Sequence, residues 1–423
     1  MSIAQLKEKI SSGLYDDQFA LIYNDIAPQK ERYLAACDEF LKIYPDGDAR
    51  LFSAPGRTEV GGNHTDHQHG CVLAGSVDLD VIAVVCLNGT DKIRVKSKGY
   101  DMDEICINDL SKKDAEIGKA RSLIRGMCAY FKEIGVNLQG FNAYTTSNVL
   151  KGSGLSSSAA FEVLIGNILK GLFDVDINDV EIAKLSQKTE NVYFGKPSGL
   201  MDQMASSVGG FTAIDFKDNL NPAIEKVDFD LAGNGYSLCI VNTKGDHADL
   251  TDDYAAITAE CEQISKYFGK NYLREVDENE FTSNIPSLRR EFGDRAVLRA
   301  IHFFNDNKNA VTEKEQLKKG DFKGFLKTVT DSGNSSNKYL QNAYSSKNLS
   351  NQGINIALSL TERFLQGEGA CRVHGGGFGG TIQAFVPNGI LTSYKEYIEK
   401  IFGEDSCYVL NIRKIGGFIF KQR

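Results

Sequence analysis

Residues 152–160 read GSGLSSSAA and lie between a segment that predicts a strand, 141–149, and a long apolar segment that predicts a helix. Glycines let backbone N–H groups approach an anion closely, and the first turn of a helix adds unsatisfied N–H donors and a positive dipole end. Such a site fits phosphate, although it is not a Walker loop, because no Lys-Ser/Thr follows a G-x-x-x-x-G spacing. A serine-capped helix after a glycine turn explains the same residues equally well.

A second glycine-rich stretch, GGGFGG at 375–380, matches G-x-G-x-x-G in form. A dinucleotide-binding fingerprint must open a helix, whereas the residues that follow here, TIQAFV, are typical of a strand. The Rossmann interpretation is therefore rejected. Five glycines in six residues between two strands predict a backbone that packs close to another loop or to a ligand.

A third stretch, PGRTEVGGNHTDHQHG at 55–70, is almost wholly polar. Zinc binding through His64, His67 and His69 is one interpretation, but no predicted helix places these histidines on one face, and no cysteine or second acid completes a ligand set. Turn residues that bond to their own backbone are a second interpretation. A pocket for a polar ligand is the third.

The bulk composition sets limits on the function. A chain of 423 residues is too long for one ordinary core and predicts two domains, with a change of architecture near 210–230. A net charge of −8 argues against sequence-independent nucleic-acid binding. No apolar run predicts a membrane span, and the N-terminus lacks the apolar stretch of a signal peptide. Nine scattered cysteines without a C-x-x-C suit reduced thiols in the cytoplasm.

Hydrophobic periodicity predicts helices and strands along the whole chain. The expected helices cover 29–45, 119–134, the segment after 157, 179–193, 253–266, 296–304, 313–329 and 351–366. The expected strands cover 51–55, 77–89, 91–99, 141–149, 236–243, 371–374, 381–386 and 407–421. This pattern places GSGLSSSAA at the start of a helix and GGGFGG between two strands.

The three stretches, in the order APGRTEVGGNHTDHQHG, GSGLSSSAA and GGGFGG, resemble galactokinases, and more broadly the galacto-, homoserine, mevalonate and phosphomevalonate kinases. ENVYFGKPSGLMDQMASSVGG and NTKGDHADLTDDY resemble further family segments, so that the resemblance covers roughly residues 30–420. It implies a two-lobed α+β fold, with an N-terminal domain like ribosomal protein S5 domain 2 and a ferredoxin-like C-terminal domain. The expected divisions are an extension at 1–30, a sugar- and ATP-binding domain at 31–215 and a C-terminal domain at 216–423.

The same resemblance assigns roles, and the implied reaction is ATP-dependent phosphorylation of the anomeric C1 hydroxyl of galactose. The implied catalytic pair is Arg57 and Asp202, and the implied magnesium ligands are Ser158 and Glu190. The implied sugar contacts are Asn63, His64, Asp66, Gly199 and Tyr254. The implied ATP phosphate loop consists of Gly152, Ser153, Gly154, Leu155, Ser156, Ser157 and Ser158. The expected partners are the sugar, ATP and Mg²⁺, in a cytoplasmic monomer or weak homodimer that binds no nucleic acid and no membrane.

One departure from the family pattern leaves the sugar open. Galactokinases usually show Gly-Glu-His where this chain has Gly62-Asn63-His64, and the missing glutamate is the one expected to bind the sugar's 6-hydroxyl. An amide still donates to and accepts from a hydroxyl, but it no longer repels a carboxylate at C6. Galacturonate, or another galactose-type sugar, is therefore an alternative substrate. A non-catalytic galactose sensor is a further alternative, although the implied catalytic pair and phosphate loop are intact.

Overall fold

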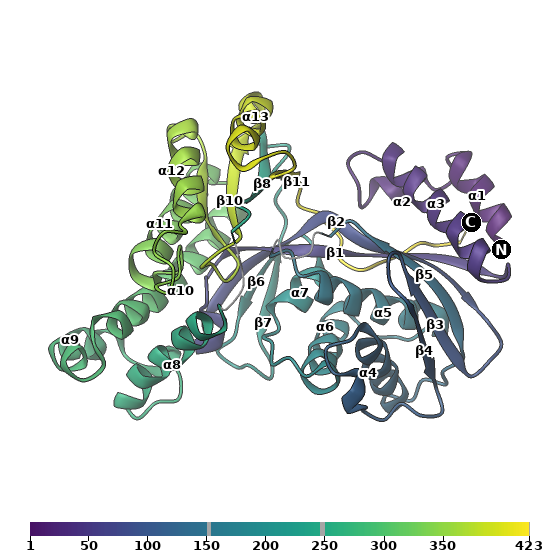
Figure 1. The fold of residues 1–423 in the computed structure, drawn as a ribbon, viewed down its shortest axis with the longest axis horizontal. Helices are drawn as coiled ribbons and strands as arrows, with labels where there is room; N and C mark the ends of the chain where they lie inside the picture. Colours follow the sequence, from purple (N-terminus) through teal and green to yellow (C-terminus); the bar gives the residue numbers. More distant parts are fainter. Residues whose placement is uncertain (150–153, 246–249, 423) are drawn as a thin grey trace.

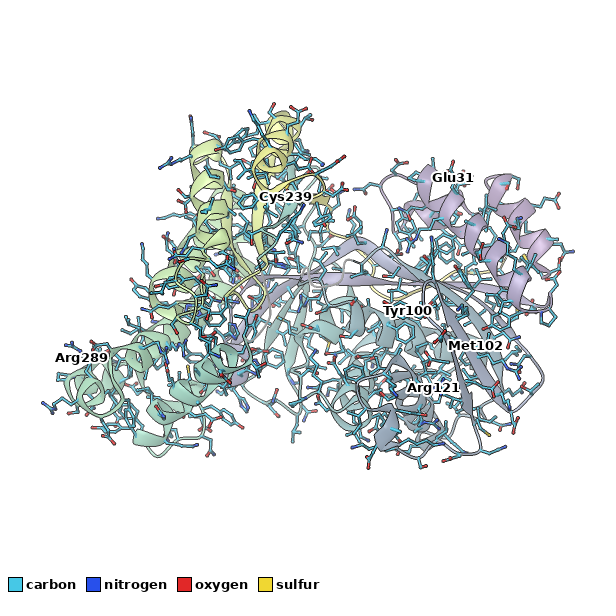
Figure 2. The ribbon with its side chains drawn as sticks, in the orientation of Figure 1. Glu31, Tyr100, Met102, Arg121, Cys239 and Arg289 are labelled. Atoms are coloured by element: carbon cyan, nitrogen blue, oxygen red, sulfur yellow. The ribbon has the colours of Figure 1, made fainter. Side chains whose placement is uncertain are left out.

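In the computed structural model, which describes residues 1–149, 154–245 and 250–422, two long strands form the spine of a first sheet (Figure 1). These strands, β1 (Ala49–Gly61) and β2 (Cys71–Leu87), pair antiparallel along most of their length. The register of β1 shifts between Pro55 and Arg57. Such a β-bulge re-aims the side chains that follow it, and here it lies next to the candidate catalytic arginine.

Six further strands complete the first sheet among the described residues. The C-terminal half of β2 pairs with β5, which pairs in parallel with β3, and β3 pairs with β4. The N-terminal half of β2 pairs with β6, which pairs with β7, and β12 pairs with β1. The bounds are β3 (Lys92–Ser97), β4 (Met102–Cys106), β5 (Phe141–Ser147), β6 (Phe211–Asp215), β7 (Ala223–Val227) and β12 (Phe418–Ile419).

A second, antiparallel sheet has the strand order β11-β8-β10-β9 and stands beside one end of the first (Figure 1). Its strands are β8 (Tyr236–Asn242), β9 (Ala370–His374), β10 (Thr381–Pro387) and β11 (Cys407–Leu410). The glycine-rich residues 375–380 form the turn between β9 and β10, as the sequence predicted. This turn reaches the first sheet and carries two residues into the candidate site.

Helices cover both sheets (Figure 1). Helices α4–α7 lie on one face of the first sheet and α1–α3 on the other, whereas α8–α13 belong to the second lobe. None of the helices in the described parts of the chain has the length and apolar composition that crossing a bilayer requires. The bounds are α1 (Ile3–Ser11), α2 (Asp16–Ala20), α3 (Ala27–Ile43), α4 (Ala120–Glu133), α5 (Ser157–Phe173), α6 (Asp179–Thr189), α7 (Met201–Val208), α8 (Thr251–Tyr267), α9 (Glu278–Phe292), α10 (Asp294–Lys319), α11 (Phe322–Ser335), α12 (Gly353–Leu365) and α13 (Leu391–Phe402).

The unbroken apolar run in β2 follows from burial on both faces. Ala83 and Val85 belong to the core that includes α4 and α5. Ile82, Val84 and Cys86 belong to a separate core beneath α1–α3. Because neighbouring side chains of a strand point to opposite faces, a strand with helices on both sides loses the alternation of apolar and polar residues.

The first thirty residues, expected as an extension, pack against this second face. Leu6 and Phe19 lie in one cluster with Phe420, close to the C-terminus. The side chain of Gln18 donates to the carbonyl of Lys421 at 3.0 Å and accepts from its N–H at 2.7 Å. The two ends of the chain therefore meet on the same side of the sheet (Figure 1).

Several expected elements differ from the observed ones. The single helix expected at 313–329 is wrong, because α10 ends at Lys319, Gly320 follows with a positive φ of 70°, and Asp321 caps α11. The strand expected at 407–421 is two short strands, β11 and β12, which belong to different sheets. Helices α1, α2, α7, α9 and α13 and strands β4, β6 and β7 were not predicted.

The expected boundary between residues 215 and 216 falls inside a strand pair. β6 ends at Asp215, and β7 pairs with it antiparallel from Phe211 opposite Val227 to Asp215 opposite Ala223. The first sheet therefore continues to Val227, and the chain returns to this sheet at β12.

Candidate active site

Arg57 and Asp202 meet although they are 145 residues apart. Arg57 Nε donates to Asp202 Oδ1 at 2.7 Å, and Arg57 Nη2 lies 2.6 Å from the same oxygen. Ser156 Oγ donates to Asp202 Oδ2, and Arg57 Nη1 donates to the carbonyl of Gly154. The cluster thus joins β1, the loop before α5 and the first turn of α7.

The environment of Asp202 favours its ionised form. Burial raises the pKa of the Asp202 carboxyl, but the Arg57 charge and the hydrogen bond from Ser156 outweigh it, and the pKa lies below the ordinary value. The positive end of the α7 dipole acts in the same direction. The side chain of Asp202 keeps 23% of its surface exposed, against 9% for Arg57, so a ligand can reach the carboxylate.

A pocket of about 280 Å³ opens onto this pair. Arg57, His64, Asp66, Gly199 and Asp202 all line it, so five of the predicted catalytic and sugar-binding residues come together. A larger hollow of about 490 Å³ between α3 and β3 contains none of them. The remaining lining residues are Glu59, His67, Lys196, Pro197, Ser198, Met201, Gly375 and Gly376.

Two of the sugar-contact candidates are held by backbone geometry. Gly199 lies so close to Asp66 that a Cβ on it would be 2.8 Å from Asp66 Oδ2. His64 has a positive φ of 58°, and its Nε2 donates to the carbonyl of Gly376 at 3.0 Å. Burial lowers the pKa of His64 to about 4, so its ring is neutral at physiological pH, and Nδ1 is left as an acceptor.

Two other candidates, Asn63 and Tyr254, do not line this pocket. Asn63 is fully buried; its Nδ2 donates to Glu59 and Gly375, and its Oδ1 accepts from Asn342 at 2.7 Å. The expected contact between Asn63 and a sugar therefore has no free polar atom to make it. The Tyr254 hydroxyl donates to the carbonyl of Gly377 at 3.1 Å, beside the pocket wall.

The start of α5 lies beside the catalytic pair. Ser156 is the N-cap residue, with a positive φ of 52°, but its side chain makes no capping hydrogen bond and is directed to Asp202 instead. The serine-capped interpretation is therefore wrong, and no N-cap side chain satisfies the first N–H groups of α5, an arrangement suited to an anion. Ser157 and Ser158 lie in that first turn and Leu155 is buried before it. Gly152 and Ser153 lie outside the described residues.

The two candidate magnesium ligands are neighbours. Ser158 Oγ donates to Glu190 Oε1 at 3.2 Å, so a hydroxyl and a carboxylate converge beside the start of α5. Glu190 is 1% exposed and also accepts from Lys196, Ser198 and Gln203. Hard oxygen donors of this kind fit Mg²⁺, which completes its shell with phosphate oxygens and water. No group of three or more His, Cys, Asp or Glu in the described residues is arranged to hold a metal, so zinc at 55–70 has no support.

The GGGFGG turn packs closely, as predicted. A Cβ on Gly376 would lie 2.4 Å from the Tyr254 ring, and one on Gly377 would lie 2.2 Å from the carbonyl of Asn342. His374, just before the turn, is buried between Thr58 Oγ1 and Thr381 Oγ1, each 3.0 Å from a ring nitrogen. The turn therefore fixes the second lobe against β1.

Sequence reasoning missed two charged residues of the pocket, Glu59 and Lys196. Glu59 is two positions after Arg57, and residues two apart on a strand share a face, so this signal was present. It was overlooked because the strand was expected to end at residue 55. Lys196 Nζ lies 3.0 Å from Glu190 Oε1, and no local sequence pattern predicts that contact.

Several known proteins resemble this chain in sequence. The galactokinase of Lactobacillus helveticus is 31% identical to the chain over 370 residues, which cover 85% of this chain and 91% of that protein. The chain belongs to the galactokinase family. A galactokinase of Limosilactobacillus reuteri is 28% identical over 394 residues, covering 90% of this chain and 95% of that one. Two family models also match, the galactokinase galactose-binding signature at residues 38–87 and the GHMP kinases N terminal domain at residues 122–210.

The family's fold is found in solved structures. The crystal structure of Lactococcus lactis galactokinase complexed with galactose superposes with a TM-score of 0.77 at 24% identity, covering 91% of this chain and 99% of that one. Mevalonate kinase of Methanococcus jannaschii superposes with a TM-score of 0.60 at 16% identity, covering 87% and 99%. The expected α+β fold with two lobes, and the relation to the wider kinase group, are confirmed.

Proposed function

We propose that the chain is an ATP-dependent kinase that phosphorylates the anomeric C1 hydroxyl of galactose. The observation that carries the proposal is the Arg57–Asp202 pair, which faces a polar pocket and adjoins the start of α5. The galactokinase relatives support galactose as the sugar. The nine cysteines, all within the described residues, are free thiols, which supports a cytoplasmic location.

In this proposal the protein acts mainly by positioning and by charge. The C1 oxygen attacks the γ-phosphorus of ATP, and the bond from phosphorus to the β–γ bridging oxygen breaks. Asp202 accepts the hydrogen bond of the attacking hydroxyl and takes up its proton. Arg57 keeps Asp202 ionised and offsets negative charge on the transferring phosphoryl group. His64, Asp66 and Gly199 orient the sugar, with Tyr254 behind them.

The phosphate side of the proposed site consists of residues 152–158 and the start of α5. Ser158 and Glu190 are the proposed holders of Mg²⁺, which when bound neutralises charge on the ATP phosphates. Gln203 Nε2 fixes Glu190 Oε2 at 3.0 Å and also reaches Glu162 Oε2 at 3.1 Å. Burial, and then the charge of Glu190, raise the pKa of Glu162 well above its ordinary value. Burial thus disfavours the charged form of Glu162, whereas Glu190 is the carboxylate that meets Ser158.

Glu190→Gln is expected to raise the Mg²⁺ concentration for half-maximal activity by at least about 10-fold, because it replaces the carboxylate ligand by an amide. A magnesium titration at saturating ATP and sugar measures this. The matched control is Glu133→Gln, on the exposed end of α4, which should leave the titration unchanged. An unchanged titration in Glu190→Gln would remove Glu190 from the metal site.

A panel of sugars tests the proposed reaction directly. ADP release with Mg-ATP is measured against galactose, N-acetylgalactosamine, galacturonate, arabinose and glucose, and galactose is expected to give the highest kcat/KM. A higher value for galacturonate keeps the fold and reaction type but changes the substrate. Galactose binding without ADP release under any condition would support the sensor alternative and overturn the kinase.

A further inference from the structure

Glu59 is a pocket-lining carboxylate with no role in the reaction described above. We propose that Glu59 binds the 6-hydroxyl of the sugar and that its carboxylate excludes sugars with a carboxylate at C6. This proposal rests on the proposed function, because it names the group that selects the sugar in the same pocket.

The Glu59 carboxylate is fixed on one side only. Its Oε1 accepts from Asn63 Nδ2 at 2.7 Å and from Arg372 Nη2 at 3.1 Å. Its Oε2 makes no hydrogen bond within the described parts of the chain, although the side chain is only 7% exposed and lines the pocket. A carboxylate oxygen that is open to the pocket and has no protein partner is an acceptor for a ligand that donates to it.

Glu59 lies one strand step from the position expected for C1. Residues two apart on a strand point to the same face and are separated by roughly 6.6 Å. Arg57 bonds to Asp202, where the C1 hydroxyl is expected, and Glu59 follows one step along the same face. In a hexopyranose, C1 and the carbon that carries C6 flank the ring oxygen, so a sugar that presents C1 to Asp202 with this edge along β1 places its 6-hydroxyl at Glu59.

Asn63 acts here as a positioning residue. Its Nδ2 lies 2.7 Å from Glu59 Oε1 and 2.8 Å from the carbonyl of Gly375. Its side chain therefore approaches the same point of the pocket wall that Glu59 occupies. The amide at position 63 and the carboxylate at position 59 therefore form one hydrogen-bonded pair at the pocket wall.

Charges of both signs surround Glu59. Burial raises the pKa of Glu59 to about 7, although Arg372 and Arg57 lower it. Because its folded pKa is raised, Glu59 is ionised above about pH 7 and becomes neutral as the pH falls through that value. Asp66 and Glu313 lie near Glu59, His302 and Glu313 lie near Arg372, and His64 lines the same pocket as Glu59. Asp306 lies near His302 and Glu313.

Two kinds of measurement test the proposal. The first compares kcat/KM for galactose, 6-deoxygalactose and galacturonate in the wild type and in Glu59→Gln. The variant is expected to lower the galactose value 10- to 100-fold, chiefly through KM, and to change the 6-deoxygalactose value less than about threefold. The ratio of galacturonate to galactose, with galacturonate measured as substrate or competitive inhibitor, is expected to rise at least 10-fold.

The matched control is Glu313→Gln. Glu313 on α10 is fully buried, also lies near Arg372 and does not line the pocket, so the same substitution there should leave all three sugars within about twofold. The rescue is the double variant Glu59→Asn/Asn63→Glu, which returns a carboxylate to the loop and should recover the preference for galactose over 6-deoxygalactose. Glu59→Asn alone should not recover it.

The second measurement uses the wild type alone and does not depend on how a variant folds. The ratio of kcat/KM for galactose over galacturonate should fall as the pH decreases from 8 to 6, because the repelling charge on Glu59 is lost. Titration of ATP affects both sugars equally and cancels in the ratio. A flat ratio, or a Glu59→Gln variant that lowers all three sugars by the same factor, would overturn the proposal. Wild type that phosphorylates no sugar would overturn the proposed function instead.

Discussion

Asp202→Asn is expected to lower kcat for galactose about 10²- to 10⁴-fold, the range that loss of a positioned proton acceptor usually gives. The amide has the shape of the carboxylate, and it can accept from Arg57 through Oδ1 while Nδ2 faces the Ser156 hydroxyl. It cannot take up a proton at physiological pH. The fold should therefore persist while the chemical step slows.

The measurement separates binding from chemistry. Steady-state kinetics with galactose should show the loss in kcat, and a melting curve should place the variant within a few degrees of the wild type. Asp331→Asn, an exposed position on α11, is the matched control and should leave kcat unchanged. Turnover close to wild type in Asp202→Asn would remove Asp202 from its proposed role.

The pH profile offers a related check on Asp202. Its pKa lies below the ordinary value of 3.8, so Asp202 remains ionised throughout the range from pH 5 to 9. Any loss of activity between pH 8 and 6 must therefore come from another group, such as ATP itself or Glu59, whose pKa is about 7. Asp202 and Glu59 differ for a physical reason. The Arg57 charge and the Ser156 hydrogen bond outweigh burial at Asp202, whereas at the more deeply buried Glu59 burial outweighs the charges of Arg372 and Arg57.

The candidate site residues were predicted from the resemblance of short, unusual stretches of sequence to galactokinases. The loop before α5 and the polar wall of the pocket correspond to the stretches GSGLSSSAA and PGRTEVGGNHTDHQHG. The structure brings together Arg57, His64, Asp66, Gly199 and Asp202. The sequence did not predict the burial of Asn63, because the groups that occupy its side chain come from residues 59, 336, 342 and 375. Residues 336, 342 and 375 are far from Asn63 along the chain, so their contacts with it leave no local sequence pattern.

The packing of residues 1–30 was not predicted for the same reason. Helices α1 and α2 are short, and their packing with β1, β2 and the C-terminal residues stabilises them. The N-terminal helices, β2 and the C-terminal residues meet at the buried carboxylate of Asp80 on β2. Arg32 of α3 donates to it at 2.5 Å, Arg413 near the C-terminus lies 3.0 Å away, and the hydroxyls of Tyr23 and Ser53 complete the cluster.

Asp80→Asn is expected to lower the free energy of unfolding by about 3–5 kcal/mol, because the fully buried Arg413 then lacks its carboxylate. Denaturant titration measures this. Asp78→Asn, on the same strand, is the matched control. The Asp78 carboxylate accepts from the backbone N–H and the side-chain amide of Asn411, and the change should cost about 1 kcal/mol. The same galactose kinetics in folded Asp80→Asn would confirm that the cluster serves stability alone.

The difference in stability between wild type and Asp80→Asn should depend on pH through the pKa of Asp80. Burial raises that pKa, but Arg32 and Arg413 outweigh it, so the folded value lies below the ordinary 3.8. The stabilisation is therefore fully present above about pH 4 and is lost as the pH falls through the folded pKa. The gap between wild type and Asp80→Asn should stay constant from pH 8 to 5 and narrow below pH 4. A gap that instead narrowed between pH 8 and 5 would mean that Asp80 is not held ionised by its two arginines.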